Sequence, residues 1–266
     1  MSELHLYHND MSSCSQKVRL VLDEKELKWH SHHMNLRKGE TRSKEYIAKF
    51  NKNGVVPTLV DGKNIIIEST IIIEYLEDAF TQKSLRPVDA NSIAVMRLWN
   101  KRVDDSLHSS IAIISSCLAF RFQFLDKYTT EEINNLIAKI PSEKRQEISK
   151  DTIFNGLNSK FLPGALNEYI KLFDDLDAHL SKNDWLAGDN YSLADITYTP
   201  YLTRFEHLNL SIFYEKKKFL SNWYSKIKMK RNYTQSISNW NNNEYLDLMY
   251  KKGKEALPQI KKIVSL

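Results

Sequence analysis

The stretch that decides the fold is Asn53-Gly54-Val55-Val56-Pro57-Thr58-Leu59, followed by Asp61-Gly62 and then by Ile65-Ile66-Ile67-Glu68-Ser69-Thr70. Its order predicts a strand, a turn, a second strand and a helix, because β-branched runs flank a turn and apolar residues then recur at helical spacing. Pro57 cannot donate a hydrogen bond to a sheet. A proline at the mouth of a strand therefore favours a cis peptide bond, which leaves the backbone of Val56 free for a ligand.

Ser69 is predicted to be the N-cap of the helix that follows, whose apolar face carries Ile72, Ile73 and Leu76. The first N–H groups of a helix have no partner within the helix, and the helix dipole favours an anion beside them. Together with the free backbone of Val56, this helix start predicts a site for a peptide-like carboxylate.

A second strand–helix junction is predicted near the N-terminus. Residues 4–7 alternate like a short strand, and residues 18–22 give the next helix an apolar face. Between them lies the loop Ser12-Ser13-Cys14-Ser15, in which any of the three serines can cap the helix. The loop lacks the second cysteine of a C-x-x-C pair, which argues against dithiol redox chemistry. The sequence leaves open a mechanism in which Cys14 reacts as a single thiol.

These motifs resemble those of the glutathione transferase superfamily, and the likeness covers nearly the whole chain. It implies a thioredoxin-like α/β N-terminal domain (residues 1–80), a linker (81–90) and an all-α C-terminal domain (91–266), which together form the glutathione transferase fold. It also implies an enzyme with glutathione as its cosubstrate. By this likeness Val56, at its step to Pro57, pairs with the cysteinyl unit of glutathione, and Glu68 and Ser69 hold the γ-glutamyl end.

Catalysis by such an enzyme depends on activation of the glutathione thiol. Lowering a thiol pKa from about 8.5 needs positive potential and hydrogen-bond donors aimed at the sulfur. A helix N-terminus supplies the potential, and a serine hydroxyl supplies the donor. The Ser-Ser-Cys-Ser loop looks like that of the zeta class, which implies Ser12 as the activating residue. Ser15 is an alternative, and so is Cys14 if it forms a mixed disulfide with glutathione.

A closer likeness joins residues 68–78, 85–89, 97–104 and 191–196 to bacterial glutathione transferases of the β-etherase type. It implies attack of the thiolate on an apolar, aromatic electrophile, with β-aryl ether cleavage as one form of the reaction. Lys52 and Val55 depart from the family's usual residues at their positions. The glycyl carboxylate of glutathione is therefore expected at Arg37, Lys38 or another basic residue.

Two other functions stay open at this point. The chain could be a non-catalytic module that keeps the fold and only binds ligands or proteins. It could also be a zeta-like glutathione-dependent isomerase, which would need cationic groups in its pocket to hold a dicarboxylate. Besides the loop, the expected pocket lining comprises Tyr7, His8, Met11 and the helix residues around Ile111 and Ser115.

Composition indicates the cellular compartment and the classes of partner that we expect. The chain has 266 residues and only two cysteines, and its N-terminus shows no apolar signal-peptide core, so we expect a cytoplasmic protein. No apolar run approaches the roughly 20 residues that cross a bilayer, so we expect no membrane partner. The net charge of +5 lies in runs typical of solvated helix faces, which argues against nucleic-acid binding. A homodimer is expected from the family likeness.

In the second domain a long helix is predicted from Ile93 through Leu118, and another is predicted to open at Pro163. The segment 129–160 is charged and is expected to form a helix and a loop beside the active cleft. Ser192-Leu193-Ala194-Asp195 fits a capping box, so Asp195 is predicted to stabilise the fold. His30, His32 and His33 lie along a predicted strand, and the sequence shows no second cluster of metal-ligand residues, so no metal site is expected.

Overall fold

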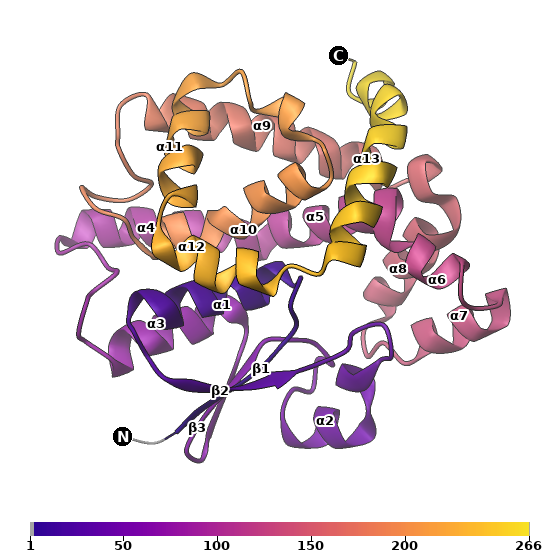
Figure 1. Ribbon diagram of the computed structural model, residues 1–266, viewed down its shortest axis with the longest axis horizontal. Helices are drawn as coiled ribbons and strands as arrows, with labels where there is room; N and C mark the ends of the chain where they lie inside the picture. Colours follow the sequence, from indigo (N-terminus) through magenta and orange to yellow (C-terminus); the bar gives the residue numbers. More distant parts are fainter. Residues whose placement is uncertain (1–2, 266) are drawn as a thin grey trace.

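The structure is a computed structural model that describes residues 3–265 (Figure 1). Its first domain is built on a sheet of four strands: β1 (Leu4–His8), β2 (Trp29–His33), β3 (Thr58–Asp61) and β4 (Asn64–Ile67). The order is β2-β1-β3-β4, in which β1 is parallel to β2 and antiparallel to β3. Strands β3 and β4 form the antiparallel hairpin that the sequence predicts.

Three helices complete this domain: α1 (Ser13–Glu24), α2 (Lys44–Lys49) and α3 (Ser69–Ala79). Helices α1 and α3 lie between the sheet and the helices of the second domain (Figure 1). The apolar face predicted for α1 is buried, but so are the charged side chains of Lys17 and Arg19. Their burial follows from the position of α1, which packs against α3 and against two helices of the second domain.

The second domain is helical throughout the part of it that the structure describes. Its helices are α4 (Ala90–Arg102), α5 (His108–Ser115), α6 (Phe122–Leu125), α7 (Thr130–Ala138), α8 (Glu143–Asn155), α9 (Leu162–Leu180), α10 (Leu193–His207), α11 (Lys218–Lys228), α12 (Arg231–Ser236) and α13 (Asn243–Ile263). The molecule is therefore an α/β domain followed by an all-α domain, as predicted. No helix between residues 3 and 265 is long and apolar enough to cross a membrane.

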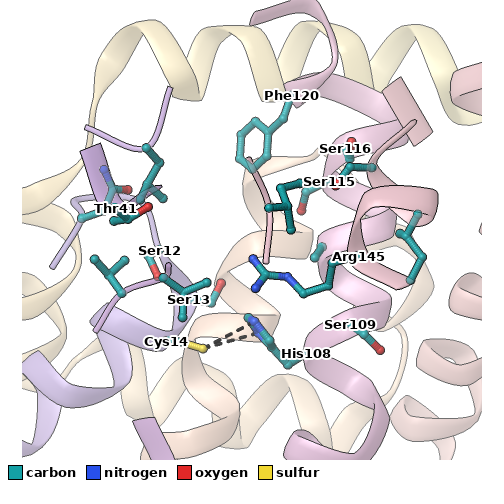
Figure 2. A pocket seen from close by; sticks show the side chains of 18 of the residues that line it. Ser12, Ser13, Cys14, Thr41, His108, Ser109, Ser115, Ser116, Phe120 and Arg145 are labelled. Carbon is teal, nitrogen blue, oxygen red and sulfur yellow. Dashed lines mark hydrogen bonds between the residues drawn. The ribbon is translucent and has the colours of Figure 1, made fainter. Parts of the chain in front are cut away.

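The predicted long helix is present but contains two π-helical turns, η2 (Val103–Leu107) and η3 (Ser116–Phe120), on either side of α5. A π-turn closes its hydrogen bond one residue later than an α-turn, so it rotates every side chain that follows it. His108 is the first residue after η2 and lies in the pocket drawn in Figure 2. Hydrophobic periodicity alone does not reveal such turns.

The helix predicted to open at Pro163 is α9, in which Pro163 is the second residue. Its apolar residues at helical spacing are buried: Leu166, Tyr169, Phe173, Leu176 and Leu180. The segment from Thr129 to Lys160 forms two helices, α7 and α8, rather than a helix and a loop. Helix α13 contains Pro258 and continues past it to Ile263.

Between Ala79 and Ala90 the chain forms neither a helix nor a strand. This segment is tied to the first domain through Glu77, whose carboxylate accepts hydrogen bonds from the backbone N–H of Leu85 and from the hydroxyl of Ser84. The buried Lys25 ammonium lies 2.7 Å from the same carboxylate and donates to the carbonyl of Phe80. This buried network holds the connection in place where the two domains meet.

Candidate functional site

A cavity of about 670 Å³ lies where the two domains meet (Figure 2). The first domain contributes the loop before α1, the segment around Pro57 and the start of α3, and the second domain contributes mainly α5, η3, α7, α8 and Arg204 of α10. Of the expected lining residues, Met11, Ile111 and Ser115 are present. Tyr7 and His8 are not among the residues that line it: Tyr7 stacks on His32, and His8 is fully buried.

The peptide bond between Val56 and Pro57 is cis, as predicted, and both residues line the cavity. The segment is braced from behind, since the hydroxyl of Tyr46 donates to the carbonyl of Val55 at 2.9 Å. Within residues 3–265 the backbone of Val56 makes no hydrogen bond. Its N–H and C=O are therefore available to a ligand, as the sequence predicts.

The start of α3 differs in one detail from the expectation. Ser69 is the first helical residue and not the N-cap, which is Glu68. Glu68 has a φ of 67°, a region that costs energy for a residue with a Cβ and that clusters at functional sites. Its side chain makes no capping bond and instead accepts from the amide of Asn53. The first N–H groups of α3 thus stay free to bind an anion beside the Ser69 hydroxyl.

The three candidate residues of the first loop, Ser12, Cys14 and Ser15, have different surroundings in the structure. Ser12 is the N-cap of α1, where its hydroxyl oxygen accepts from the N–H of Ser15 at 3.3 Å, and it lines the cavity. Its hydroxyl proton is not used by that bond and can be donated to a ligand. Ser15 is fully buried, is not among the lining residues, and accepts from the N–H of Asn9. Cys14 lines the cavity.

Cys14 meets a partner that the sequence reading did not find. Its Sγ lies 3.4 Å from Nδ1 of His108, the residue that follows η2, as Figure 2 shows. Burial alone would raise the pKa of the Cys14 thiol. The charge and the hydrogen bond of His108, together with Lys17 and the Ser69 hydroxyl, outweigh burial and lower the Cys14 pKa to about 6. The thiolate in turn raises the pKa of His108, so the two groups favour a thiolate–imidazolium pair.

Lys17 supplies a second positive charge from beneath the cavity. Its fully buried ammonium donates to the Thr70 hydroxyl at 2.9 Å, and Thr70 donates to the carboxylate of Asp104 at 2.8 Å. Burial lowers the pKa of Lys17, and the charges of Cys14 and Asp104 oppose that shift. This chain of contacts links α1, α3 and η2 directly behind Cys14.

Four arginines also line the cavity: Arg37, Arg42, Arg145 and Arg204. Of these four, the sequence indicates only Arg37 as a candidate for the glycyl carboxylate. An isolated arginine in a chain with many basic residues cannot be recognised as a site residue from its neighbours. Lys38 is exposed and is not among the lining residues. No group of three or more His, Cys, Asp or Glu side chains placed to bind a metal occurs in the described chain.

Comparison with known proteins agrees with this geometry. The N-terminal domain model of glutathione S-transferases matches residues 6–84, and the C-terminal domain model matches residues 162–229. The protein LigF of Sphingobium sp. is 32% identical over 195 residues, which cover 73% of this chain and 75% of LigF. The chain belongs to the glutathione S-transferase family.

The solved structure of LigF and one further relative describe this glutathione transferase more closely. The crystal structure of the β-etherase LigF superposes with a TM-score of 0.80 at 27% identity, and covers 90% of this chain and all of that one. The tetrachloro-p-hydroquinone reductive dehalogenase of Sphingobium chlorophenolicum is 27% identical over 247 residues, which cover 90% of this chain and 98% of the relative. The chain is thus a glutathione-dependent enzyme similar to a β-etherase and to a tetrachloro-p-hydroquinone reductive dehalogenase.

Proposed function

We propose that this glutathione transferase attacks an aromatic electrophile at carbon, with the glutathione thiol activated by Ser12. The observation that carries the proposal is the convergence of three elements on one cavity: the hydroxyl of Ser12, the free backbone of Val56 and the uncapped start of α3. A tripeptide with a carboxylate at each end and a thiol between them matches this arrangement. The names of the relatives LigF and tetrachloro-p-hydroquinone reductive dehalogenase support an aromatic electrophile.

In this mechanism the γ-glutamyl carboxylate binds at Ser69 and the start of α3, where free N–H groups and the helix dipole favour it. The cysteinyl unit pairs with the backbone of Val56, and Pro57 fixes that backbone. The thiolate then accepts a hydrogen bond from the hydroxyl of Ser12 at the start of α1. Attack forms the carbon–sulfur bond and releases the leaving group, which departs with the bonding electrons.

The glycyl carboxylate has a better partner than Lys38. Arg145 donates to the carbonyl of Asn53 at 3.1 Å, and Arg42 donates to the carbonyl of Leu136 at 3.1 Å, so both guanidinium groups are fixed at the edge of the cavity beside the Val56 segment. Burial and the neighbouring arginines lower the pKa of Arg42 to about 10, and a bound carboxylate would relieve this repulsion. We assign the glycyl carboxylate to Arg42 and Arg145.

A second activity is favoured by the contact between Cys14 and His108. A Cys14 thiolate can attack the glutathione sulfur of a mixed disulfide between glutathione and another thiol, which forms a disulfide between Cys14 and glutathione and releases the other thiol as its thiolate. A glutathione thiolate then cleaves the Cys14–glutathione disulfide, regenerates the Cys14 thiolate and releases glutathione disulfide. Only Cys14 is required for this exchange.

Two variants separate the activities. Ser12→Ala should raise the pKa of bound glutathione and lower turnover of an aryl chloride near neutral pH, because the thiolate loses its hydrogen-bond donor. Cys14→Ala should keep aryl chloride turnover and abolish disulfide exchange. Thiolate absorbance against pH, measured in both variants, reports the pKa directly. Loss of aryl chloride turnover in Cys14→Ala with full activity in Ser12→Ala would reverse the assignment.

The electrophile class is tested with a model β-aryl ether, an aryl chloride and a cis-dicarboxylate, while the glutathione consumed per product is counted. Transfer consumes one glutathione per product. Isomerisation of the dicarboxylate without net consumption of glutathione would identify a zeta-like isomerase and contradict the proposal.

We also propose a cytoplasmic homodimer. The free thiols of Cys14 and Cys117 support a reducing compartment.

A further inference from the structure

Phe120, the last residue of the π-turn η3, is contacted by two guanidinium groups at the cavity wall. The guanidinium carbon of Arg37 lies 4.8 Å from the centre of the Phe120 ring, and that of Arg204 lies 5.0 Å from it. Arg37 comes from the loop after β2 and Arg204 from α10, so the two charges are brought together by the fold. In Figure 2 Phe120 lies at the opposite end of the view from Cys14 and His108.

Neither guanidinium is neutralised by the protein. Arg204 is 6% exposed and donates to the carbonyl of Met11 and to the hydroxyl of Ser115, which are neutral acceptors. The Nε atoms of Arg37 and Arg204 are buried and have no hydrogen-bond partner among the described residues. No carboxylate of residues 3–265 forms an ion pair with either group, although the charge of Asp10 acts on Arg37. The Asp10 carboxylate itself lies 3.6 Å from Nε2 of His33.

The two positive charges also act on each other. Burial and then the charge of Arg37 lower the pKa of Arg204 to about 10. Burial likewise lowers the pKa of Arg37, which the neighbouring Tyr245 hydroxyl only partly offsets. Buried charges normally occur paired, so two adjacent unpaired guanidinium groups that open into a cavity indicate a missing anion.

Glutathione does not supply this anion in the arrangement proposed above. Its γ-glutamyl carboxylate is held at Ser69, and its glycyl carboxylate is held at Arg42 and Arg145. Arg204 is instead bonded to the carbonyl of Met11, the residue before Ser12. An anion held by Arg37 and Arg204 is therefore distinct from both carboxylates of glutathione.

We propose that Arg37 and Arg204 bind an anionic substituent, such as a carboxylate, on the aromatic electrophile, whose ring packs against Phe120. This inference rests on the proposed function, because it places the electrophile beside a bound glutathione. It adds an anionic group to the apolar, aromatic electrophile that the sequence predicts. The planar guanidinium fork matches a carboxylate, and the ring faces supply the apolar contact.

Two matched probes test the site: 4-chloro-3-nitrobenzoate and the neutral 4-chloro-3-nitrobenzamide. In each, the glutathione thiolate bonds to the carbon that bears chlorine, and chloride leaves. The wild type should favour the benzoate over the benzamide in kcat/KM by about tenfold or more, since a charge-assisted hydrogen bond is worth about 1.5–3 kcal/mol. Arg37→Gln should reduce this preference about tenfold, with glutathione affinity unchanged.

Arg42→Gln is the matched control, because it removes another arginine of the same cavity. It should weaken glutathione binding and leave the preference for benzoate intact. An equal loss of preference in both variants, or equal kcat/KM for the two probes in the wild type, would overturn the proposal. Thermal melts verify that each variant is folded before its kinetics are compared.

Calorimetry without glutathione keeps the inference separate from the proposed function. The benzoate should bind the wild type more tightly than the benzamide, and Arg37→Gln should remove that difference. If glutathione does not bind but the benzoate preference persists, the anion site stands and the transferase mechanism fails. If glutathione binds and reacts but neither probe is preferred, the mechanism stands and the anion site is wrong.

Discussion

At the scale of single residues, the cavity holds a contact between Cys14 and His108, which are 94 positions apart in the chain. The hydroxyl of Tyr201, a residue of α10, lies 3.4 Å from Nδ1 of His108 and supports the imidazole. A cysteine whose thiol is ionised at neutral pH is far more reactive than an ordinary buried one. Cys117 is the contrast within the same molecule, since burial raises its pKa to about 12.

This contrast predicts a single reactive cysteine. The rate of alkylation by iodoacetamide should follow the Cys14 thiolate and reach half its maximum near pH 6, the pKa that Cys14 has beside His108. His108→Ala should move this midpoint upward by roughly 1–3 units, because burial is then no longer opposed by the imidazolium. Cys14→Ala should leave no fast labelling in the folded protein. A midpoint that stays near pH 6 in His108→Ala would show that the imidazole does not set the pKa.

A second prediction concerns Ser69. Ser69→Ala should weaken glutathione binding by about 1.5–3 kcal/mol, because one charge-assisted hydrogen bond to the γ-glutamyl carboxylate is lost. The fold should survive, since Ser69 is not the helix cap. Ser109→Ala is a suitable control, because its hydroxyl donates to the carbonyl of Ser106 within its own helix. Calorimetric titration of both variants decides the point, and an unchanged affinity in Ser69→Ala would remove Ser69 from the glutathione site.

At the scale of elements, the capping box of α10 is a buried anchor of the second domain. Asp195 is fully buried, and its carboxylate accepts from the N–H groups of Leu186 and Ser192, from the Ser192 hydroxyl and from the indole N–H of Trp223. Burial raises the pKa of Asp195 to about 6, although these four donors favour the charged form. The predicted capping box is present, and its bonds extend beyond the helix to the preceding turn and to α11.

Asp195→Ala should therefore destabilise the protein more than an exposed cap would. Several buried donors lose their acceptor, which costs about 1–3 kcal/mol for each group left unsatisfied, so we expect a loss of roughly 2–5 kcal/mol. Glutathione affinity of the folded fraction should not change. Thermal melts and calorimetry measured together test this. Normal stability with lost turnover would instead place Asp195 in the catalytic machinery.

The raised pKa of Asp195 also makes the stability of the fold depend on pH. A folded-state pKa raised to about 6 from the ordinary aspartate value means that the native protein holds the proton more tightly than the unfolded chain. Between those two values stability falls as the pH rises. Asp195→Asn should lose this dependence while it keeps part of the hydrogen bonding. Denaturant unfolding of wild type and Asp195→Asn at pH 5 and pH 7 should show it.

How much the sequence could predict follows from how local each signal is. The cis proline, the start of α3, the Ser-Ser-Cys-Ser loop and the capping box depend on neighbours in the chain. The structure confirms the cis peptide bond and the capping box, and it places the loop and the start of α3 at the cavity. Arg204 and His108 lie within helices where nothing local distinguishes them. Their roles depend on which helices meet and on the π-turns η2 and η3, and hydrophobic periodicity does not encode either.

At the scale of the whole molecule, an apolar surface is exposed on α3 and α4. Ile71 is 58% exposed and Leu98 is 67% exposed. The two helices share this face, because Glu74 of α3 lies 3.5 Å from Arg97 of α4. A shallow hollow on α4 adjoins Leu98 and is lined by Ala90, Ile93, Ala94, Arg97, Leu98 and Lys101. Large side chains exposed together in this way are typical of an interface.

The homodimer proposed for this protein should use that surface. In light scattering coupled to gel filtration, the wild type should have twice the chain mass of 31.1 kDa. Leu98→Glu should shift it to the monomer mass, because a charge at the centre of an apolar interface is desolvated without a partner. Phe219→Glu is the control, since Phe219 is an exposed apolar residue of α11, away from α3 and α4. It should leave the dimer intact. A wild type that runs at 31.1 kDa would exclude the dimer, and dissociation by Phe219→Glu but not by Leu98→Glu would move the interface to α11.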